Sequence, residues 1–216
     1  MFITFEGIEG SGKTTQIHHA AAFLADAGHR CRITKEPGGT AIGRQIRSIL
    51  LDPQHRDIHS VTELLLYAAD RNQHVQELIR PALADGETVI CDRFHDSTVV
   101  YQGYARSLDM ALIEDLHARL LDDLRPDMTF VLDLDPAIGL KRAWQQVSRG
   151  DRTDRETRFE NEALSFHQKV RAGYLDLARR EPERFTVVDG AQDEETVKNF
   201  ILRILADRIG DQRYKV

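Results

Sequence analysis

The first residues of evident chemistry form a glycine-rich loop that runs from Gly7 to Thr14. Its letters, GIEGSGKT, match the spacing G-x-x-x-x-G-K-[ST] at every defined position. The loop lies between a predicted strand and a predicted helix, where backbone N–H groups and the positive end of the helix can face phosphate oxygens. Lys13 adds a positive charge, and the Thr14 hydroxyl can bind Mg²⁺. We therefore expect the protein to bind ATP or GTP.

A carboxylate at the end of a neighbouring strand should complete the magnesium site. Asp92 closes the segment TVICD and is the preferred candidate, while Asp133 and Asp135 follow the apolar segment MTFVL and are the alternatives. Such a carboxylate reaches the metal from the same edge of the sheet as the loop threonine. The sequence thus predicts Thr14 and Asp92 as the metal ligands.

Arginines at the ends of other elements indicate a second anionic ligand. Arg71 follows the segment YAAD and Arg93 follows Asp92, and two guanidinium groups in one cleft would suit a second phosphate group. Residues 148–158 hold four arginines and a glycine between two predicted helices, as a mobile lid over a transferring phosphoryl group would. The chain has no N-K-x-D tetrapeptide for reading guanine. A kinase is therefore favoured over a GTPase or a motor.

Five predicted strands alternate with helices and position these residues. The strands are expected at residues 2–6, 30–35, 88–92, 128–134 and 185–188. The helices are expected at residues 17–28, 42–50, 61–83, 109–124, 136–144, 159–180 and 197–205, with Pro81 kinking or ending the third. Several strands are unbroken apolar runs, which predicts an α/β fold with a parallel sheet covered on both faces.

Composition predicts a single domain over residues 1–216, with the lid at about 148–158. The formal net charge is −6, which argues against a general grip on nucleic acid. Cys31 and Cys91 lie far apart in a chain without a CxxC pair, so a zinc site is not expected and a reducing compartment is. No apolar run reaches the roughly 20 residues of a membrane span, and the start of the chain lacks the features of a secretion signal. We expect a cytoplasmic protein without a membrane partner.

The chain resembles the bacterial thymidylate kinases (dTMP kinases) over nearly its whole length. The resemblance rests on the segments FEGIEGSGKTT (5–15), EPGGT (36–40), LLLYAADRNQH (64–74), DRFHDSTVVYQG (92–103), VLDLDP (131–136) and RFENEALSFHQKVRAGYL (158–175). It implies a P-loop nucleoside-monophosphate kinase fold with a five-stranded parallel sheet and an arginine-rich lid. It also implies a homodimer that transfers the γ-phosphoryl group of MgATP to dTMP, giving dTDP and ADP for dTTP synthesis.

The resemblance assigns roles to individual positions. It implies that the ATP phosphates are bound by Gly7, Ile8, Glu9, Gly10, Ser11, Gly12, Lys13, Thr14 and Thr15. It implies that dTMP is bound by Glu9, Glu36, Pro37, Tyr67, Arg71, Arg93, Ser97, Tyr101 and Gln102. Among these, Tyr67 would stack on thymine, Tyr101 would pack against the deoxyribose, and Arg71, Ser97 and Gln102 would read the base edge. The implied catalytic residues are Lys13, Arg93, Arg149 and Arg158.

The assignment of a catalytic arginine to the lid depends on one feature of the glycine-rich loop. Because the loop interior contains no arginine, the resemblance places the catalytic guanidinium in the lid, with Arg149 the best match and Arg158 the second. The lid is about four residues longer than in similar kinases, so the roles of Arg152 and Arg155 stay open. The histidines, including His18, His19 and His95, are expected at the surface or in packing contacts, and no general base is assigned.

Two other functions are compatible with these residues. One is a kinase that acts on another monophosphate or on a deoxynucleoside, and the other is a binding module in which ATP closes the lid without turnover. The paired Arg71 and Arg93 favour a phosphorylated acceptor over a nucleoside. Asp96 is expected to be a cap or a salt-bridge partner, and Phe94, where similar kinases carry tyrosine, is expected to be a packing change.

Overall fold

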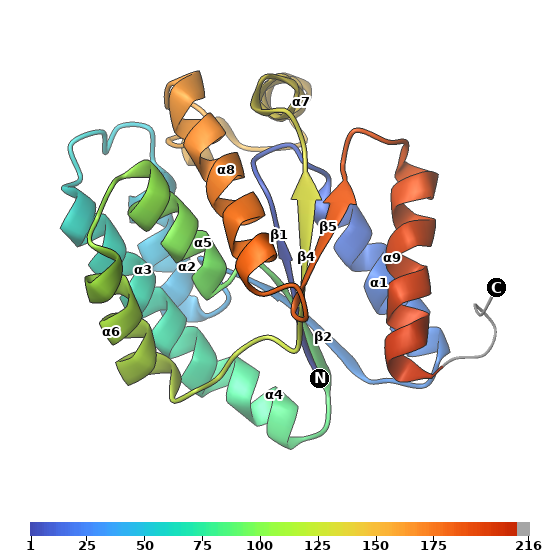
Figure 1. Cartoon of the computed structure of the whole chain (residues 1–216). Coiled ribbons are helices and arrows are strands. Elements are labelled where there is room, and N and C mark those ends of the chain that lie inside the picture. Colours follow the sequence, from blue (N-terminus) through green and yellow to red (C-terminus); the bar gives the residue numbers. More distant parts are fainter. Residues whose placement is uncertain (211–216) are drawn as a thin grey trace.

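A parallel sheet with helices on both sides forms the centre of the computed structural model, which describes residues 1–210 (Figure 1). The last six positions of the predicted 1–216 domain lie outside the described residues. The strands are β1 (Phe2–Glu6), β2 (Cys31–Lys35), β3 (Thr88–Asp92), β4 (Met128–Asp133) and β5 (Phe185–Asp189). Their order is β2-β3-β1-β4-β5, and every neighbouring pair is parallel. The predicted strands and the fold class are confirmed.

Burial of the side chains explains why the strands could be predicted from the sequence. In the central strands β1, β3 and β4 almost every side chain is buried, whereas the edge strands β2 and β5 each include exposed positions. A strand covered on both faces needs apolar side chains in both directions, so it reads as an unbroken apolar run. Ile3 and Phe5 of β1 belong to one core, and Phe2 belongs to another on the opposite face.

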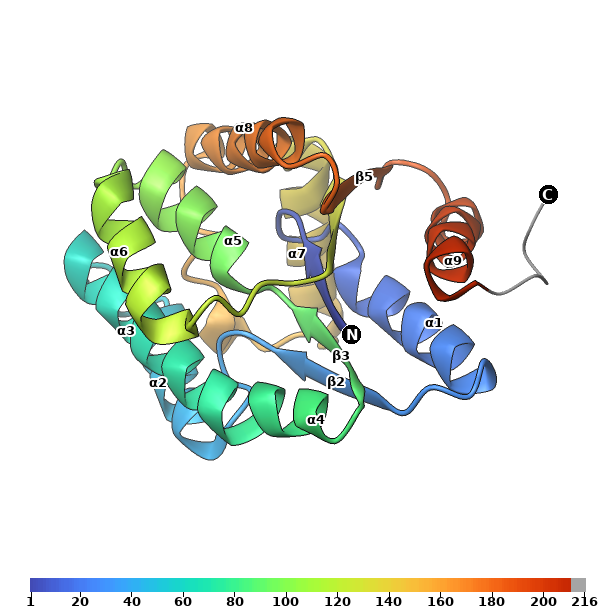
Figure 2. The ribbon, with the colours of Figure 1, turned by 60° about the horizontal axis from the view of Figure 1, so that its bottom comes forward.

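The helices divide between the two faces of the sheet. The full set is α1 (Lys13–Asp26), α2 (Ala41–Leu51), α3 (Ser60–His74), α4 (Arg80–Ala84), α5 (His95–Thr98), α6 (Met110–Leu121), α7 (Pro136–Arg149), α8 (Leu164–Arg180) and α9 (Glu194–Ile209). Helices α1 and α9 cover one face, and α2 to α6 with α8 cover the other (Figure 2). Helix α7 lies beyond the carboxyl ends of the strands, beside the phosphate loop. No helix within residues 1–210 is long and apolar enough to cross a membrane.

Two helix predictions were wrong at one end, and in a third the proline does not end the helix. The helix expected over 61–83 is confirmed as a continuous helical stretch made of α3, a π-helical segment η1 (Val75–Ile79) and α4, but Pro81 stands in the first turn of α4 instead of ending the helix. Helix α7 extends past Trp144 to Arg149 and ends at Gly150, whose φ of 78° suits glycine. The helix expected from Phe159 begins at Leu164, because residues 159–163 form turns beside the cavity described below.

The helical segment at residues 95–105 was missed. It consists of α5 and the π-helical η2 (Val99–Ala105). Its letters, HDSTVVYQGYA, are rich in β-branched and aromatic residues, which locally disfavour a helix. Close packing against α8 overrides this preference, since a side-chain carbon at Gly173 would lie only 3.0 Å from Tyr104 and 3.2 Å from Val100.

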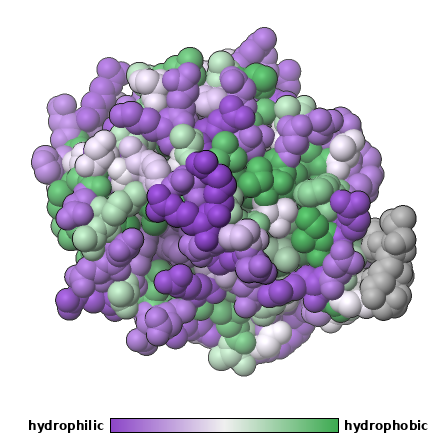
Figure 3. Space-filling view, viewed as in Figure 1, coloured by the Kyte–Doolittle hydropathy of each residue, from purple (hydrophilic) through white to green (hydrophobic). Residues whose placement is uncertain are grey.

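The surface of the face seen in Figure 1 is mixed, with apolar side chains gathered to the right of its centre (Figure 3). There β5 ends the sheet, and an apolar groove is lined by Ala172, Leu175, Ala178, Arg179 and Val187.

Candidate active site

The glycine-rich loop connects the end of β1 to the start of α1, as its motif predicts. Gly7 and Gly10 have φ angles of 134° and 71°, a region that favours glycine. A side-chain carbon at Gly10 would lie 2.1 Å from the carbonyl oxygen of Gly139 in α7, and one at Gly7 would lie 2.5 Å from that of Leu132 in β4. Only glycine fits at either position, so the backbone follows a tight path around the space above α1.

Lys13 turns back over this loop. Its Nζ donates hydrogen bonds to the carbonyl oxygens of Gly7 at 3.0 Å and Ile8 at 2.9 Å. Burial and the positive charge of Arg93 lower the pKa of Lys13 to about 8. The lysine is therefore held in place by the loop itself, with its charge at the edge of the cavity where an anion would stabilise it.

Asp92 is the strand-end carboxylate that faces the loop. Its Oδ2 accepts a long hydrogen bond of 3.5 Å from the Thr14 hydroxyl. The alternatives are engaged elsewhere, because Asp133 forms an ion pair of 2.6 Å with Arg171 and Asp135 caps α7. Within residues 1–210 no cluster of three or more metal-ligating side chains occurs. One hydroxyl and one carboxylate suit Mg²⁺, which takes its remaining oxygen ligands from water and phosphates.

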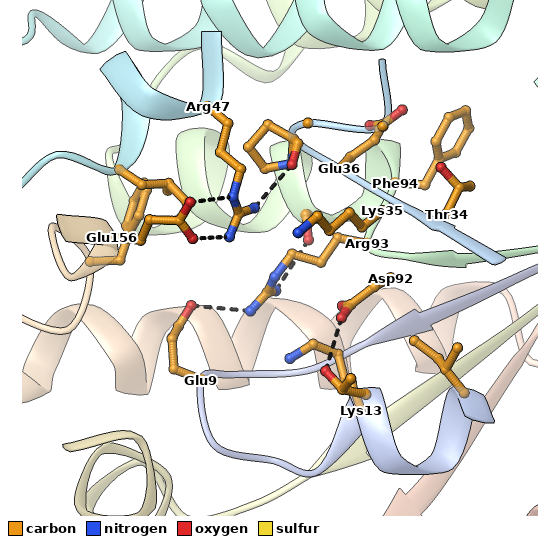
Figure 4. A pocket seen from close by; sticks show the side chains of 18 of the residues that line it. Glu9, Lys13, Thr34, Lys35, Glu36, Arg47, Asp92, Arg93, Phe94 and Glu156 are labelled. Carbon is orange, nitrogen blue, oxygen red and sulfur yellow. Dashed lines mark hydrogen bonds and ion pairs between the residues drawn. The ribbon is translucent and has the colours of Figure 1, made fainter. Parts of the chain in front are cut away.

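A cavity of about 590 Å³ opens at the carboxyl ends of the strands, within the range of small-molecule sites. Most of the predicted residues line it: Glu9, Gly10, Ser11, Gly12, Lys13, Thr14, Thr15, Glu36, Pro37, Tyr67, Arg71, Asp92, Arg93, Ser97, Tyr101 and Gln102. Four predicted residues do not line it: Gly7, Ile8, Arg149 and Arg158. Figure 4 shows Lys13, Asp92 and Arg93 directed into the same space. The cavity thus joins the loop to the side chains predicted for a second ligand.

Arg93 lies between the loop and the second half of the cavity. Its guanidinium donates to Glu9 at 3.1 Å (Figure 4). It also donates to Tyr174 at 3.1 Å and lies 5.1 Å from the centre of the Tyr101 ring. The backbone at Arg93 has a φ of 69°, which is uncommon for a residue other than glycine. This strained turn directly after β3 directs the side chain back across the cavity.

Glu9 is held from three sides. Its Oε1 accepts hydrogen bonds from Arg93 and from the Tyr101 hydroxyl at 2.6 Å, and its Oε2 lies 3.3 Å from Nδ1 of His167. Burial opposes its charge, but His167 and Arg93 hold the pKa of Glu9 well below its usual value. Glu9 therefore stays a charged acceptor beside Tyr101.

Glu6 is fully buried behind Ser97 and does not itself line the cavity. Its carboxylate accepts hydrogen bonds from the Ser97 and Tyr174 hydroxyls, each at 2.7 Å, and from the Phe94 backbone at 2.8 Å. Burial and the charge of Asp96 raise the pKa of Glu6 to about 7. Ser97, predicted to read the base, lines the cavity, and its hydroxyl already donates a hydrogen bond to Glu6.

Arg71 enters the cavity from α3 with most of its hydrogen-bond donors occupied. It donates to Glu36 at 2.7 Å, to the Thr98 hydroxyl at 2.8 Å and to the Phe94 carbonyl at 3.2 Å. Burial acts against the charge of Glu36, but Arg71 and His74 lower its pKa. This network fixes the plane of the Arg71 guanidinium.

The lid predicted at residues 148–158 reaches the cavity through one of its arginines. Arg152 lines the cavity and forms an ion pair with the buried Glu160. Burial and the charge of Glu9 raise the pKa of Glu160. Glu156 of the lid pairs with Arg47 of α2 at 2.6 Å, which joins the lid to the opposite wall (Figure 4).

The other lid arginines lie elsewhere. Arg149 is exposed at the end of α7, one turn beyond Gln146, which does line the cavity. Arg158 is buried under Phe159 and donates to Glu63 at 2.6 Å. The catalytic roles of Arg149 and Arg158 stay predictions, and the structure places Arg152 closer to the site than either.

Sequence reasoning missed several residues around the site. His74 and His167 are buried against Glu36 and Glu9, yet histidines were expected only at the surface or in packing contacts. Both occur inside segments that carry the resemblance, but no spacing marks their contacts. Two smaller expectations are confirmed, since Asp96 forms an ion pair of 2.6 Å with Arg184 and Phe94 packs edge-on against Phe2.

Comparisons with known proteins agree with this geometry. The family model "Thymidylate kinase" matches residues 5–201. Thymidylate kinase of Desulfosudis oleivorans is 58% identical over 189 residues, covering 88% of each chain, and that of Geobacter sulfurreducens is 52% identical over 208 residues, covering 96% of this chain and 97% of that protein. A crystal structure of thymidylate kinase from Ehrlichia chaffeensis superposes with a TM-score of 0.74 at 35% identity, covering 95% of this chain and 98% of the other. The chain belongs to the thymidylate kinase family.

Proposed function

We propose that the protein transfers the γ-phosphoryl group of ATP to dTMP, giving dTDP and ADP as a step towards dTTP. The observation that carries this proposal is the position of Arg93 opposite Lys13 in one cavity. The two cations are close enough for the charge of Arg93 to lower the pKa of Lys13. Two positive groups held together against their repulsion suit the triphosphate of ATP and the single phosphate of dTMP meeting end to end.

On the donor side, the loop residues 7–15 would bind the ATP phosphates through backbone N–H groups. Lys13 would contact the transferred group, and Thr14 with Asp92 would hold Mg²⁺. When bound, the metal neutralises charge on the phosphate oxygens. The oxygen pair formed by Thr14 and Asp92 supports this assignment, because Mg²⁺ prefers such ligands.

On the acceptor side, Arg93 would bind the phosphate of dTMP and Tyr67 would stack on thymine. Arg71 and Gln102 would face the base edge, while Tyr101 and Glu9 would border the deoxyribose and Glu36 with Pro37 would complete the wall. The hydrogen bond between Tyr101 and Glu9 supports a closed sugar pocket with little room for a further hydroxyl.

The chemistry then requires alignment and charge neutralisation. The phosphate oxygen of dTMP is already a competent nucleophile, so no side chain needs to remove a proton. Arg93 would orient that oxygen, Lys13 would draw charge from the transferred group, and the lid would bring a further guanidinium over both. The cavity position of Arg152 supports a lid that supplies this charge.

The proposal includes a homodimer in the cytoplasm. Exposed apolar side chains on three adjacent helices support an interface with a second copy: Ile42 and Ile49 on α2, Leu65 on α3, and Leu112 on α6. Light scattering coupled to gel filtration would test the dimer.

A coupled assay with MgATP and a panel of monophosphates tests the reaction. We expect turnover of dTMP in preference to UMP, CMP, AMP and GMP. Equal turnover of AMP would favour a broader nucleotide kinase. Absence of turnover with every acceptor, together with retained ATP binding, would favour the binding module instead.

ATP binding should take up a proton at Lys13 in mildly alkaline solution. The pKa of Lys13 is lowered to about 8 without ligand, and phosphate oxygens favour the charged form, so this pKa rises in the complex. Because more of the free enzyme is neutral at higher pH, the Kd for ATP should increase roughly tenfold between pH 7.5 and 9. Calorimetry in buffers of different ionisation enthalpy measures the proton uptake.

The variant Lys13→Arg is the matched control, since a guanidinium stays charged throughout this range. Its affinity for ATP should not change between pH 7.5 and 9. The same proton uptake in the variant would assign the titration to another group, and no uptake in the wild-type protein would contradict the prediction.

A further inference from the structure

Gln102 contacts a buried carboxylate on the side away from the cavity. Its Nε2 donates a hydrogen bond of 2.8 Å to Oε1 of Glu63 on α3. Both side chains are 1% exposed, and Gln102 lines the cavity while Glu63 does not. The contact therefore joins a residue of the site to a residue behind it.

This contact fixes which end of the amide faces the cavity. Glu63 also accepts hydrogen bonds from Arg158 at 2.6 Å and from Arg106 at 3.3 Å, and both guanidinium groups compensate its negative charge. A carboxylate can only accept, so the amide must present its NH₂ end to Glu63. The carbonyl oxygen of Gln102 is then at the other end of the amide, where Gln102 lines the cavity, and among residues 1–210 the only side-chain hydrogen bond of Gln102 is the one from its Nε2 to Glu63.

Arg71 supplies the complementary group. Its guanidinium can only donate, and Glu36, Thr98 and Phe94 hold it in place. The cavity thus offers one fixed acceptor, on Gln102, and one fixed donor, on Arg71. Thymine presents the matching pattern of an N3–H donor and a 4-carbonyl acceptor, whereas cytosine presents the reverse at both positions.

We propose that Glu63 is a positioning residue that holds the Gln102 amide in one orientation and thereby makes the pocket select thymine over cytosine. The inference rests on the proposed function, which places the base of dTMP against Gln102. Arg158, which the resemblance gives as the second candidate for catalysis, then acts through Glu63 and not on the phosphates.

The variant Glu63→Gln should reverse the amide. Arg106 and Arg158 can only donate, so they would hydrogen-bond the carbonyl oxygen of the new glutamine, and its NH₂ end would face Gln102. The amide of Gln102 would turn its carbonyl towards that NH₂ group and its own NH₂ towards the cavity, where it suits N3 of cytosine. A mispaired buried polar group weakens binding by roughly 10- to 100-fold.

The test compares dTMP with dCMP, both as ligands by calorimetry and as acceptors with MgATP. In Glu63→Gln the preference for dTMP should fall by roughly 10- to 100-fold in Kd and in kcat/KM. Glu162→Gln is the matched control, because Glu162 pairs with Arg106 at 2.6 Å but does not contact Gln102. Its preference should equal that of the wild-type protein.

The single variant leaves a buried arginine charge unbalanced, which could unfold the protein, so a second variant removes that charge as well. Glu63→Gln with Arg106→Met removes one charge of each sign and leaves Arg158 to orient the new glutamine. An unchanged preference for dTMP in a folded variant of either kind would overturn the inference. Failure of the wild-type protein to phosphorylate dTMP would instead contradict the proposed function, while a shifted ratio of the two Kd values would still support the role of Glu63.

Discussion

Replacement of Arg93 by glutamine should lower kcat/KM for dTMP by at least about 1000-fold, as expected for an arginine that contacts a reacting phosphoryl group. Arg93 is held by hydrogen bonds to Glu9, Ser97 and Tyr174, so its guanidinium is oriented before any ligand binds. The variant loses the positive charge that would attract the acceptor phosphate. It also leaves Glu9 as a buried carboxylate without its guanidinium partner. Steady-state kinetics with dTMP varied at saturating MgATP measure the effect.

The loss should appear in both KM and kcat. Arg93 would bind the acceptor in the ground state and orient its oxygen for attack, so neither parameter is spared. Arg93→Lys should recover part of the activity, because it restores the charge without the fork of donors. Arg171→Gln is the matched control, since it breaks an ion pair of 2.6 Å with Asp133 outside the cavity. More than about a thousandth of wild-type kcat/KM in Arg93→Gln would contradict the assignment.

The parts of this protein that could be read from the sequence are those that local patterns determine. The glycine-rich loop is continuous in sequence, and its backbone angles follow from the glycines. Asp92 and Arg93 stand where a buried strand ends, and parallel strands bring their carboxyl ends to one edge. The sequence therefore predicted both the sheet and the residues that converge at its edge.

Contacts between distant segments could not be predicted in this way. Glu63 meets Arg158 across 95 positions, and Glu9 of the loop meets His167 of α8. Neither spacing nor residue type marks such pairs. Their partners are polar side chains that a sequence equally allows at the surface, and only burial makes the pairing necessary.

In the lid, too, the sequence could not predict which side chain reaches the cavity, although its residues are close together in the chain. Its arginines alternate with acidic residues over 148–158, so charge alone does not distinguish them. Gly150 ends α7, and the turn after it decides which guanidinium enters the cavity. The resulting path directs Arg152 inward and leaves Arg155 exposed.

Alanine substitution of Arg152 should therefore lower kcat by at least about 100-fold, conservatively below the range for arginine fingers, with little change in the KM for dTMP. Its guanidinium lies in the cavity and is held by Glu160, whose raised pKa reflects burial and the charge of Glu9. A transferring phosphoryl group would be a stronger partner than Glu160, so a small movement would carry the charge from the wall to the reaction. Single-turnover kinetics separate this chemical step from product release.

Alanine variants of two neighbouring arginines are the controls for Arg152→Ala. Arg155→Ala removes an exposed guanidinium from the same lid and should leave kcat near the wild-type value. Arg149→Ala should have a smaller effect than Arg152→Ala, because Arg149 lies at the end of α7 outside the cavity. A larger fall in kcat for Arg149→Ala would assign the catalytic role to Arg149, as the resemblance implies. The lid would then have to close by a movement that carries the end of α7 over the phosphates. A fall confined to KM would instead assign Arg152 to binding, since a group that acts only in the transition state changes kcat.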